Sequence, residues 1–321
     1  MDLIKVIACF LVVVLHTCFT GKTELNYSFV LYYMGVIAMP LFFITNGYLL
    51  FGKTNKDKYY TYKKRDNILI LVFLWNMLYT VAYIILKHEP LNPFSNTINN
   101  LFFQSGSFGQ FWFFGSLIII YIMFPSIDRL YFENKKHFLI LAMILVFIQI
   151  IMDGLNIFTS LNFSVILQSK IPQTFRLESH LSYFILGGII KQYEKRLVKY
   201  IKMPYIIILY IIVVIYQWFM VNNIYPNLHC EFFYDNIFVI CLSSSLFIFI
   251  NNKKYKDGKN IAMMANLIML IFILHPFIIH IYDRYINTNI NAIKLIFVFS
   301  ISAIISLIIV KIPYTKRLYK I

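Results

Sequence analysis

The sequence predicts an all-helical integral membrane protein with about ten transmembrane helices and both termini in the cytoplasm. Three observations predict this class. Of the 321 residues, 60% are hydrophobic and only 13% are charged, which is too apolar for a soluble domain of this size. The apolar residues form runs that approach or exceed the length needed to cross about 30 Å of hydrocarbon. Lys and Arg lie in short clusters between these runs, which favours membrane topology over nucleic-acid binding.

Ten apolar segments carry the prediction, and the sixth is short for a span. Segments of this length in lipid must be helices, because the backbone finds no other hydrogen-bond partner there. We place them at 2–19, 29–51, 67–86, 111–128, 137–153, 180–191, 203–221, 235–250, 261–282 and 292–311. We expect no cleavable signal peptide and no folded soluble domain at either end. The whole of 1–321 is therefore treated as one polytopic domain.

The distribution of positive charge predicts the orientation. If the N-terminus is cytoplasmic, every inside connection is rich in Lys or Arg. The outside then carries only six of the 29 basic residues, which are Lys22, Lys87, Lys170, Arg176, Arg284 and Lys294. With ten spans, this arrangement places both termini in the cytoplasm.

The first segment, DLIKVIACFLVVVLHTCF, is apolar yet carries Lys5 and His16. Their separation returns to nearly the same helix face after about 16 Å of rise. Cys9 and Val12 lie between them, so this stripe is polar at both ends and slim in the middle. An ionisable residue inside a span is a functional candidate by default. The alternative is a snorkelling lysine and a histidine that is satisfied at the interface.

The second segment runs from the outside to the predicted cytoplasmic side. We expect Pro40 to kink it and Thr45, Asn46 and Gly47 to interrupt it near its cytoplasmic end. Gly47 is open to a second interpretation, in which it simply permits close helix packing.

The loop after this segment is the densest basic patch of the chain and ends with Lys64 and Arg65. A juxtamembrane cluster of this kind usually binds anionic lipid or only sets topology. It lies on the same predicted side as Lys5, however, so an anionic cytosolic ligand is a further candidate.

On the predicted outer side, Trp112 is most simply an interfacial aromatic residue. Arg176 and Glu178 lie close together in the sequence and are expected to pair in solvent. His275 is expected at a depth similar to that of His16, directly before a proline. It either caps a broken helix or takes part in a site.

Patterns of soluble enzymes are missing from the sequence. It contains no P-loop, no dinucleotide fingerprint, no HExxH and no nucleophile-elbow serine. The four cysteines have no zinc-site spacing, and we expect no metal.

What remains is an ordered set of short motifs. They are the first segment with its basic residue and histidine, PLFFITNGYLL at 40–50, Lys64-Arg65, FWFF at 111–114, YFILGGII at 183–190 and IFILHPFII at 271–279. Together they cover the chain in the order found in the acyltransferase family 3 membrane proteins, which this sequence resembles. Its nearest resemblance is to bacterial surface-polysaccharide O-acetyltransferases.

The sequence departs from the family pattern at two positions. The family usually has arginine where this chain has Lys5, so a planar bidentate contact becomes a point charge. It usually has Ser-Gly where this chain has Asn46-Gly47. Both departures concern the expected donor side.

The resemblance implies a multi-pass O-acyltransferase of the bacterial plasma membrane. It would transfer an acyl group, most simply acetyl, from cytosolic acyl-CoA to a hydroxyl of an extracytoplasmic or lipid-linked glycan. Lys5, Lys64 and Arg65, with Asn46, would bind the donor, because the CoA head group carries phosphates that need cations. His16 would act as general base, for which a neutral imidazole is suited, or would carry the acyl group covalently.

The geometry of the first segment and the positions of the polar outer loops suggest roles for the remaining candidates. The pantetheine arm would follow the slim stripe past Cys9 and Val12. On the acceptor side or behind the catalytic residue we place Trp112, Arg176, Glu178 and His275, with Trp112 as a platform on which a sugar could stack.

Two other classes of protein remain as alternatives. An exporter of polysaccharide or lipid-linked sugar would also use broken helices and intramembrane histidines, but no inverted repeat is visible. A membrane receptor would need a signalling module, which the sequence lacks. The expected partners are membrane lipids and a glycan acceptor, not nucleic acid, and the sequence leaves a homo-oligomer open.

Overall fold

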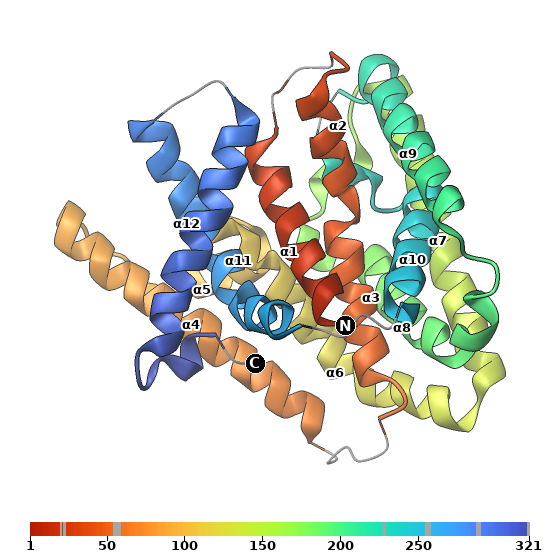
Figure 1. Ribbon diagram of the computed structural model, residues 1–321, viewed down its shortest axis with the longest axis horizontal. Helices are drawn as coiled ribbons and strands as arrows, with labels where there is room; N and C mark the ends of the chain where they lie inside the picture. Colours follow the sequence, from red (N-terminus) through yellow and green to blue (C-terminus); the bar gives the residue numbers. More distant parts are fainter. Residues whose placement is uncertain are drawn as a thin grey trace.

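A computed structural model describes residues 1–19, 21, 24–53, 59–226, 229–253, 258–286 and 290–319, and within them it contains helices and no strand. The predicted all-helical class is confirmed (Figure 1). The α-helices are α1 (Asp2–Thr17), α2 (Tyr27–Met34), α3 (Ala38–Leu50), α4 (Tyr60–Lys87), α5 (Pro93–Ile98), α6 (Trp112–Glu133), α7 (Lys135–Phe163), α8 (Leu177–Leu197), α9 (Met203–Asn223), α10 (Ile237–Asn252), α11 (Lys259–Tyr285) and α12 (Asn291–Lys311). Short turns of helix are η1 (Gly35–Ile37), η2 (Asn99–Phe103), η3 (Gly109–Phe111), η4 (Leu167–Lys170), η5 (Gln173–Phe175), η6 (Cys230–Phe233) and η7 (Thr315–Leu318).

Each of the ten predicted segments falls on a helix. Among the described residues, seven stretches are long and apolar enough to cross a membrane, and they are Tyr27–Leu50, Tyr60–Lys87, Gly109–Glu133, Lys135–Phe163, Met203–Asn223, Lys259–Tyr285 and Asn291–Lys311. The other three predicted spans fall on α1, α8 and α10. Helices α1 and α10 have 16 residues each, a rise of about 24 Å, and α8 ends in charged residues. The chain is a multi-pass membrane protein.

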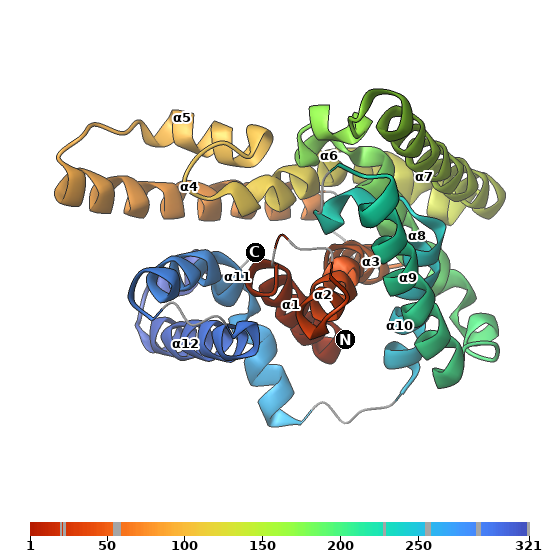
Figure 2. The same ribbon diagram turned by 90° about the horizontal axis from the view of Figure 1, so that it is seen from above.

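Helix α1 lies at the centre of the helix assembly. Seen from above, α1 to α3 occupy the middle, with α4 to α6 on one side, α11 and α12 on another, and α7 to α10 on the third (Figure 2). Helix α1 packs against α3, α11 and α12. A side chain on α1 can therefore face the interior along most of the length of the helix.

The break in the second predicted segment lies earlier than the sequence suggested. The turn η1 separates α2 from α3, and Pro40 sits in the first turn of α3, where its missing N–H costs no helical hydrogen bond. Helix α3 continues through Thr45, Asn46 and Gly47, so the predicted interruption there is wrong.

Gly47 instead permits close packing of α3 against α8. A Cβ atom at Gly47 would lie 1.8 Å from the carbonyl oxygen of Phe184, and one at Gly187 would lie 2.2 Å from that of Ile44. Two glycines, one on each helix, thus let the two backbones touch. The packing interpretation of Gly47 is the one that the structure supports.

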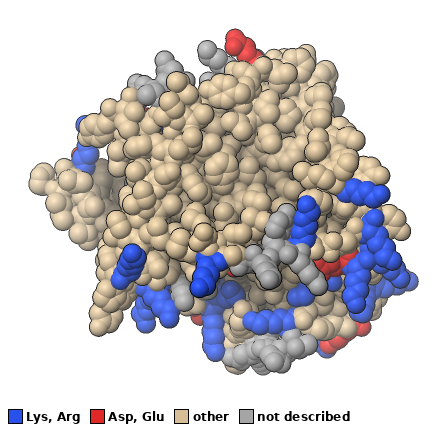
Figure 3. Space-filling model, in the orientation of Figure 1, with Lys and Arg blue, Asp and Glu red and all other residues tan. Residues whose placement is uncertain are grey.

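Charge is distributed unevenly over the surface. Figure 3 shows Lys and Arg gathered along the lower part of one face, in the region where α4 begins, while the upper part of that face is almost uncharged. Residues 54–58 and 254–257, which belong to two of the basic loops, lie outside the described residues. On this face, the folded surface thus shows the kind of charge asymmetry that predicts the orientation.

Candidate active site

Helix α1 meets two separate cavities, one toward each of its ends. His16 lines a cavity of about 480 Å³, which we call the His16 cavity. Lys5 lines a second cavity of about 480 Å³, which we call the Lys5 cavity. The two candidate residues of the first segment therefore lie on the walls of different chambers.

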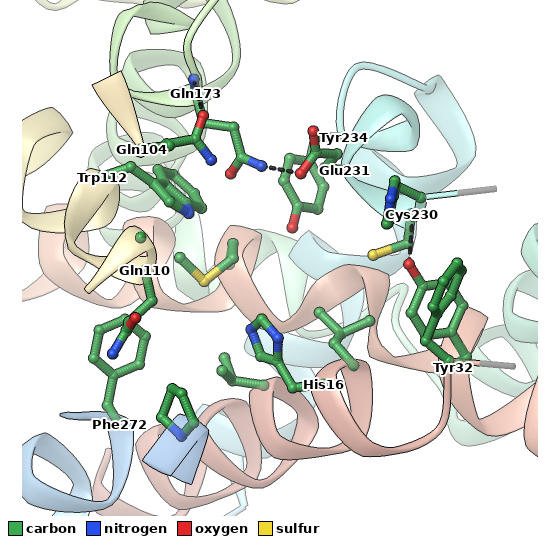
Figure 4. Close-up of a pocket in the computed structure, with 17 residues that line it drawn as sticks. His16, Tyr32, Gln104, Gln110, Trp112, Gln173, Cys230, Glu231, Tyr234 and Phe272 are labelled. Carbon is green, nitrogen blue, oxygen red and sulfur yellow. Dashed lines mark hydrogen bonds between the residues drawn. The ribbon is translucent and has the colours of Figure 1, made fainter. Parts of the chain in front are cut away.

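The His16 cavity is polar on the side opposite α1. His16 projects into it from α1 and is exposed there (Figure 4). Val12 and Leu15 of the same helix also line the cavity. Amide, phenol and carboxylate side chains form much of the remaining wall, and they are Tyr32, Gln104, Gln110, Gln173, Glu231 and Tyr234. The amides and phenols both donate and accept hydrogen bonds, and the carboxylate of Glu231 accepts them, which suits a ligand rich in hydroxyl groups.

His275 lies behind His16 rather than in the cavity. The centroids of the two imidazole rings are 5.0 Å apart, and the planes are tilted by 46°. His275 is fully buried, and its Nδ1 lies 3.1 Å from the carbonyl oxygen of Ile271, so Nδ1 carries the proton that is donated. Its neighbours Phe272 and Pro276 line the cavity, but His275 does not. His275 therefore contacts the His16 ring on the side that faces away from the cavity.

Cys230 is the other nucleophilic side chain on this wall. Burial raises the pKa of the Cys230 thiol to about 12, with a smaller opposing effect from its hydrogen bond to Tyr32. The thiolate is the nucleophilic form of cysteine. At neutral pH the Cys230 thiol is protonated, so His16 is the better candidate for chemistry in this cavity.

Trp112 begins α6 and also lines the His16 cavity. Only 7% of the residue is exposed, so it is not the interfacial aromatic residue that its position in the sequence suggested. Its ring lies over the imidazole of His180, with centroids 5.2 Å apart and planes 25° from parallel. His180 is held in turn by Ser116, 3.0 Å from Nδ1. The indole is therefore fixed in position at the cavity edge.

The Lys5 cavity brings together three of the four predicted donor-binding residues. Lys5 comes from α1, Asn46 from α3 and Lys64 from the first turns of α4. Asn46 accepts a hydrogen bond from the hydroxyl of Tyr121 at 3.1 Å, and Lys5 lies 3.3 Å from the carboxylate of Asp2. Two lysines from separate helices thus share one chamber, where they create a positive potential suited to an anionic group.

Arg65 is the exception among the predicted donor residues. It does not line the Lys5 cavity, although it follows Lys64 directly. Its guanidinium lies 2.7 Å from the carboxylate of Asp66 and 5.1 Å from the centroid of the Tyr62 ring. Successive residues of a helix point about 100° apart, so only one of this pair faces the chamber.

Aromatic side chains lie between the two cavities. Phe272 lines the His16 cavity, whereas Phe113 and Phe114 line the Lys5 cavity. The ring centroid of Phe272 is 5.8 Å from that of Phe113 and 5.6 Å from that of Phe114. These three residues form what we call the phenylalanine partition. The partition thus joins one wall of the His16 cavity to one wall of the Lys5 cavity.

The predicted path along α1 is blocked at Cys9. This residue is buried, its Sγ lies 3.8 Å from the carbonyl oxygen of Ile268 in α11, and it lines neither cavity. The packing of α1 against α11 therefore fills the stripe at Cys9, whereas Val12 does line the His16 cavity. A path through the protein would run along α3 and α6 instead.

Arg176 and Glu178 do not pair with each other in solvent. Arg176 is only 3% exposed, and its guanidinium lies 3.4 Å from the carboxylate of Glu231. Glu178 accepts a hydrogen bond from Gln168 at 3.1 Å. The expected pair is thus replaced by contacts to two other segments, and neither residue lines the His16 cavity.

The comparisons with known proteins identify the family. A family model described as an acyltransferase domain, that of acyltransferase family 3, matches residues 1–311. The chain therefore belongs to this family of membrane acyltransferases. Searches of curated proteins and of solved structures found no match.

Proposed function

We propose that the protein is a membrane O-acyltransferase that moves an acyl group, acetyl in the simplest case, from cytosolic acyl-CoA to a hydroxyl of an extracytoplasmic or lipid-linked glycan. One observation carries this proposal. A single helix, α1, presents a histidine to one chamber and a lysine to another, and the two chambers differ in charge.

The Lys5 cavity suits the donor. The phosphates of CoA need cations, and Lys5 and Lys64 supply them from two helices. Phe113, Phe114 and Tyr121 give the same chamber an aromatic wall along which the slender pantetheine arm can lie. The arm then extends past the phenylalanine partition and presents its thioester to His16.

The His16 cavity suits the acceptor. Its amides and phenols can bind sugar hydroxyls, and Trp112 offers an aromatic ring against which a sugar can pack. His16 takes the proton of the acceptor hydroxyl while the hydroxyl oxygen attacks the thioester carbonyl. The C–S bond then breaks, and the departing thiolate takes the proton from His16, so that the imidazole returns to its neutral form.

A covalent route uses the same geometry. The imidazole of His16 attacks the thioester first, and the C–S bond breaks as the thiolate of CoA leaves and takes up the proton of the imidazole ring. The acceptor hydroxyl then attacks the acyl group on His16, the bond from the acyl carbon to the ring nitrogen breaks, and the hydroxyl proton passes to the imidazole. His275 supports the ring in both routes.

The orientation that we propose follows from the charge. Ten spans with both termini in the cytoplasm place the basic surface of Figure 3 and the Lys5 cavity inside, within reach of cytosolic acyl-CoA. The His16 cavity then lies toward the outer face of a bacterial plasma membrane.

An exporter of glycan without chemistry is the competing function. Two chambers separated by a partition would also suit an exporter. Membership of an acyltransferase family favours the enzyme.

The experiment is acyl transfer by the purified protein in proteoliposomes, with acetyl-CoA labelled in its acetyl group and an envelope glycan extract as acceptor. We expect label in the glycan with the native protein and none with His16→Ala. A protein that moves glycan across the bilayer and never labels it would reverse the assignment.

A further inference from the structure

A third, smaller cavity lies beside the His16 cavity. Its volume is about 360 Å³, and the two cavities share Gln104, His229 and Glu231. Its other walls include Lys170 and Arg176. We call it the Arg176 cavity. A ligand that fills both chambers would extend from the His16 imidazole to these two cations.

Lys170 and Arg176 lie close together on the side of the protein that, in the proposed orientation, carries few Lys and Arg residues. In the orientation proposed above, six Lys and Arg residues lie outside, and two of them line this one cavity. Another of the six, Lys294, is already paired with Asp283 at 2.7 Å. Lys170 is exposed and makes no ion pair within the described part of the chain. Membrane topology does not account for these two positive charges, because the positive-inside rule predicts Lys and Arg on the cytoplasmic side.

Arg176 is buried and incompletely satisfied. Its Nε donates to the carbonyl oxygen of Ile171 at 3.1 Å, and its Nη2 lies 3.4 Å from Glu231. Its Nη1 has no hydrogen-bond partner among the described residues. The other carboxylate oxygen of Glu231 accepts from Gln173, so this carboxylate is shared between two donors. A guanidinium has a planar fork of donors that matches a carboxylate or a phosphate, and burial strengthens such a contact.

We propose that the Arg176 cavity binds an anionic group of the acceptor glycan, either the carboxylate of an acidic sugar or the phosphate of a glycosyl phosphate. This inference rests on the proposed function and specifies its acceptor. Lys170 and Arg176 hold the anion, and the neighbouring sugar ring extends past Glu231 into the His16 cavity. The anion thereby sets which hydroxyl of the acceptor lies near His16.

Direct binding to the full-length protein in detergent tests the proposal without any donor. The probes are glucuronate, glucose 1-phosphate and, as the neutral match, glucose, each titrated at low ionic strength by saturation-transfer NMR. We expect at least one anionic probe to bind about tenfold more tightly than glucose, because hydrogen bonds to charged groups are the strong ones. The tighter of the two anions identifies the source of the charge. Equal affinity for all three probes would overturn the proposal.

Variants assign the binding to this cavity. Lys170→Gln should weaken anion binding about threefold, as expected for an exposed pair. Arg176→Lys keeps the positive charge but loses the planar set of guanidinium donors. It should therefore weaken anion binding about tenfold. The matched control is Lys87→Gln, an exposed residue on the same proposed side that does not line the cavity, and it should bind as the native protein does.

The same assay separates this proposal from the proposed function. His16→Ala should lose acyl transfer and bind the anionic probe normally. Native anion affinity in both Lys170→Gln and Arg176→Lys would show that Arg176 only ties its loop to Glu231, whatever the outcome for His16. If Arg176→Lys fails to fold, the pair Lys170→Gln and Lys87→Gln still decides the question.

Discussion

The Lys5 cavity and the His16 cavity have nearly equal volumes and opposite chemistry. The first combines two lysines with aromatic walls, and the second combines an imidazole with amides and phenols. A phosphate-bearing ligand suits the first, and a hydroxylated ligand suits the second. Under the proposed function, the two substrates would bind at opposite ends of α1, and the acyl group would pass beside the phenylalanine partition to reach the acceptor.

The largest expected effect concerns His16. His16→Ala should lower the rate of acyl transfer by about 10²–10⁴-fold or more, because it removes the general base or the acyl carrier. Expression, insertion and donor affinity should be preserved. His275→Ala should cost less, since His275 supports the ring from behind, and His280→Ala, an exposed position on the same helix α11, is the control. If His16→Ala transferred acyl groups within a few-fold of the native rate, His16 would not be the catalytic residue. The chemical difference between the two cavities would then not depend on its imidazole.

The partition provides the second prediction. Phe113→Trp places a larger ring where the donor arm has to pass, and we expect about a hundredfold slower transfer, because small misplacements of a reacting group are costly. Donor affinity should change less than the rate, since the lysines that bind the phosphates are untouched. Phe10→Trp, on the exposed side of α1, is the matched control. A Phe113→Trp protein that transfers at the native rate would mean that the donor reaches His16 by another path.

Adjacent basic residues test the Lys5 cavity. Lys64→Ala should raise the KM for acyl-CoA about tenfold, because a hydrogen bond to a charged group is lost. Arg65→Ala should change it far less, because Arg65 lies outside the chamber and pairs with Asp66. The effect of Lys64→Ala should also shrink as salt is added, since salt screens the attraction. Equal effects of the two variants would indicate a diffuse basic surface instead of a defined phosphate site.

The smallest expected effect concerns an amide of the His16 cavity. Gln110→Ala should raise the KM for the acceptor about threefold, which corresponds to one neutral hydrogen bond, and leave the KM for acyl-CoA unchanged. Lys64→Ala should show the reverse selectivity. Steady-state kinetics with each substrate varied in turn measures both constants. If Gln110→Ala altered donor binding instead, the assignment of substrates to cavities would have to be exchanged.

The sequence predicted the features that depend on local pattern. Apolar runs located a helix at each of the ten segments, because a backbone in lipid has few alternatives. Helical periodicity put Lys5 and His16 on one face of α1, and both line cavities. The charge clusters identified Lys64 as a candidate, and it shares a cavity with Lys5 and Asn46.

Features that depend on the packing of distant segments were not predictable. Nothing local distinguishes Lys64 from Arg65, since the choice depends on which face α4 turns to the interior. Trp112 is buried because it packs on His180, and Arg176 pairs with Glu231 from a different loop. The polar wall of the His16 cavity was missed for the same reason. Its residues are separate in the sequence, and only the polar character of the predicted outer loops indicated them.

The most direct test of the central claim is the sidedness of the reaction. Acetyl-CoA labelled in its acetyl group does not cross membranes, and it can be added to inverted or to right-side-out vesicles from cells that contain the protein. With the Lys5 cavity on the cytoplasmic side and the His16 cavity on the other, we predict labelled glycan in the lumen of inverted vesicles and none in right-side-out vesicles. Labelling in right-side-out vesicles, or transfer only when donor and acceptor share one side of the membrane, would contradict the account.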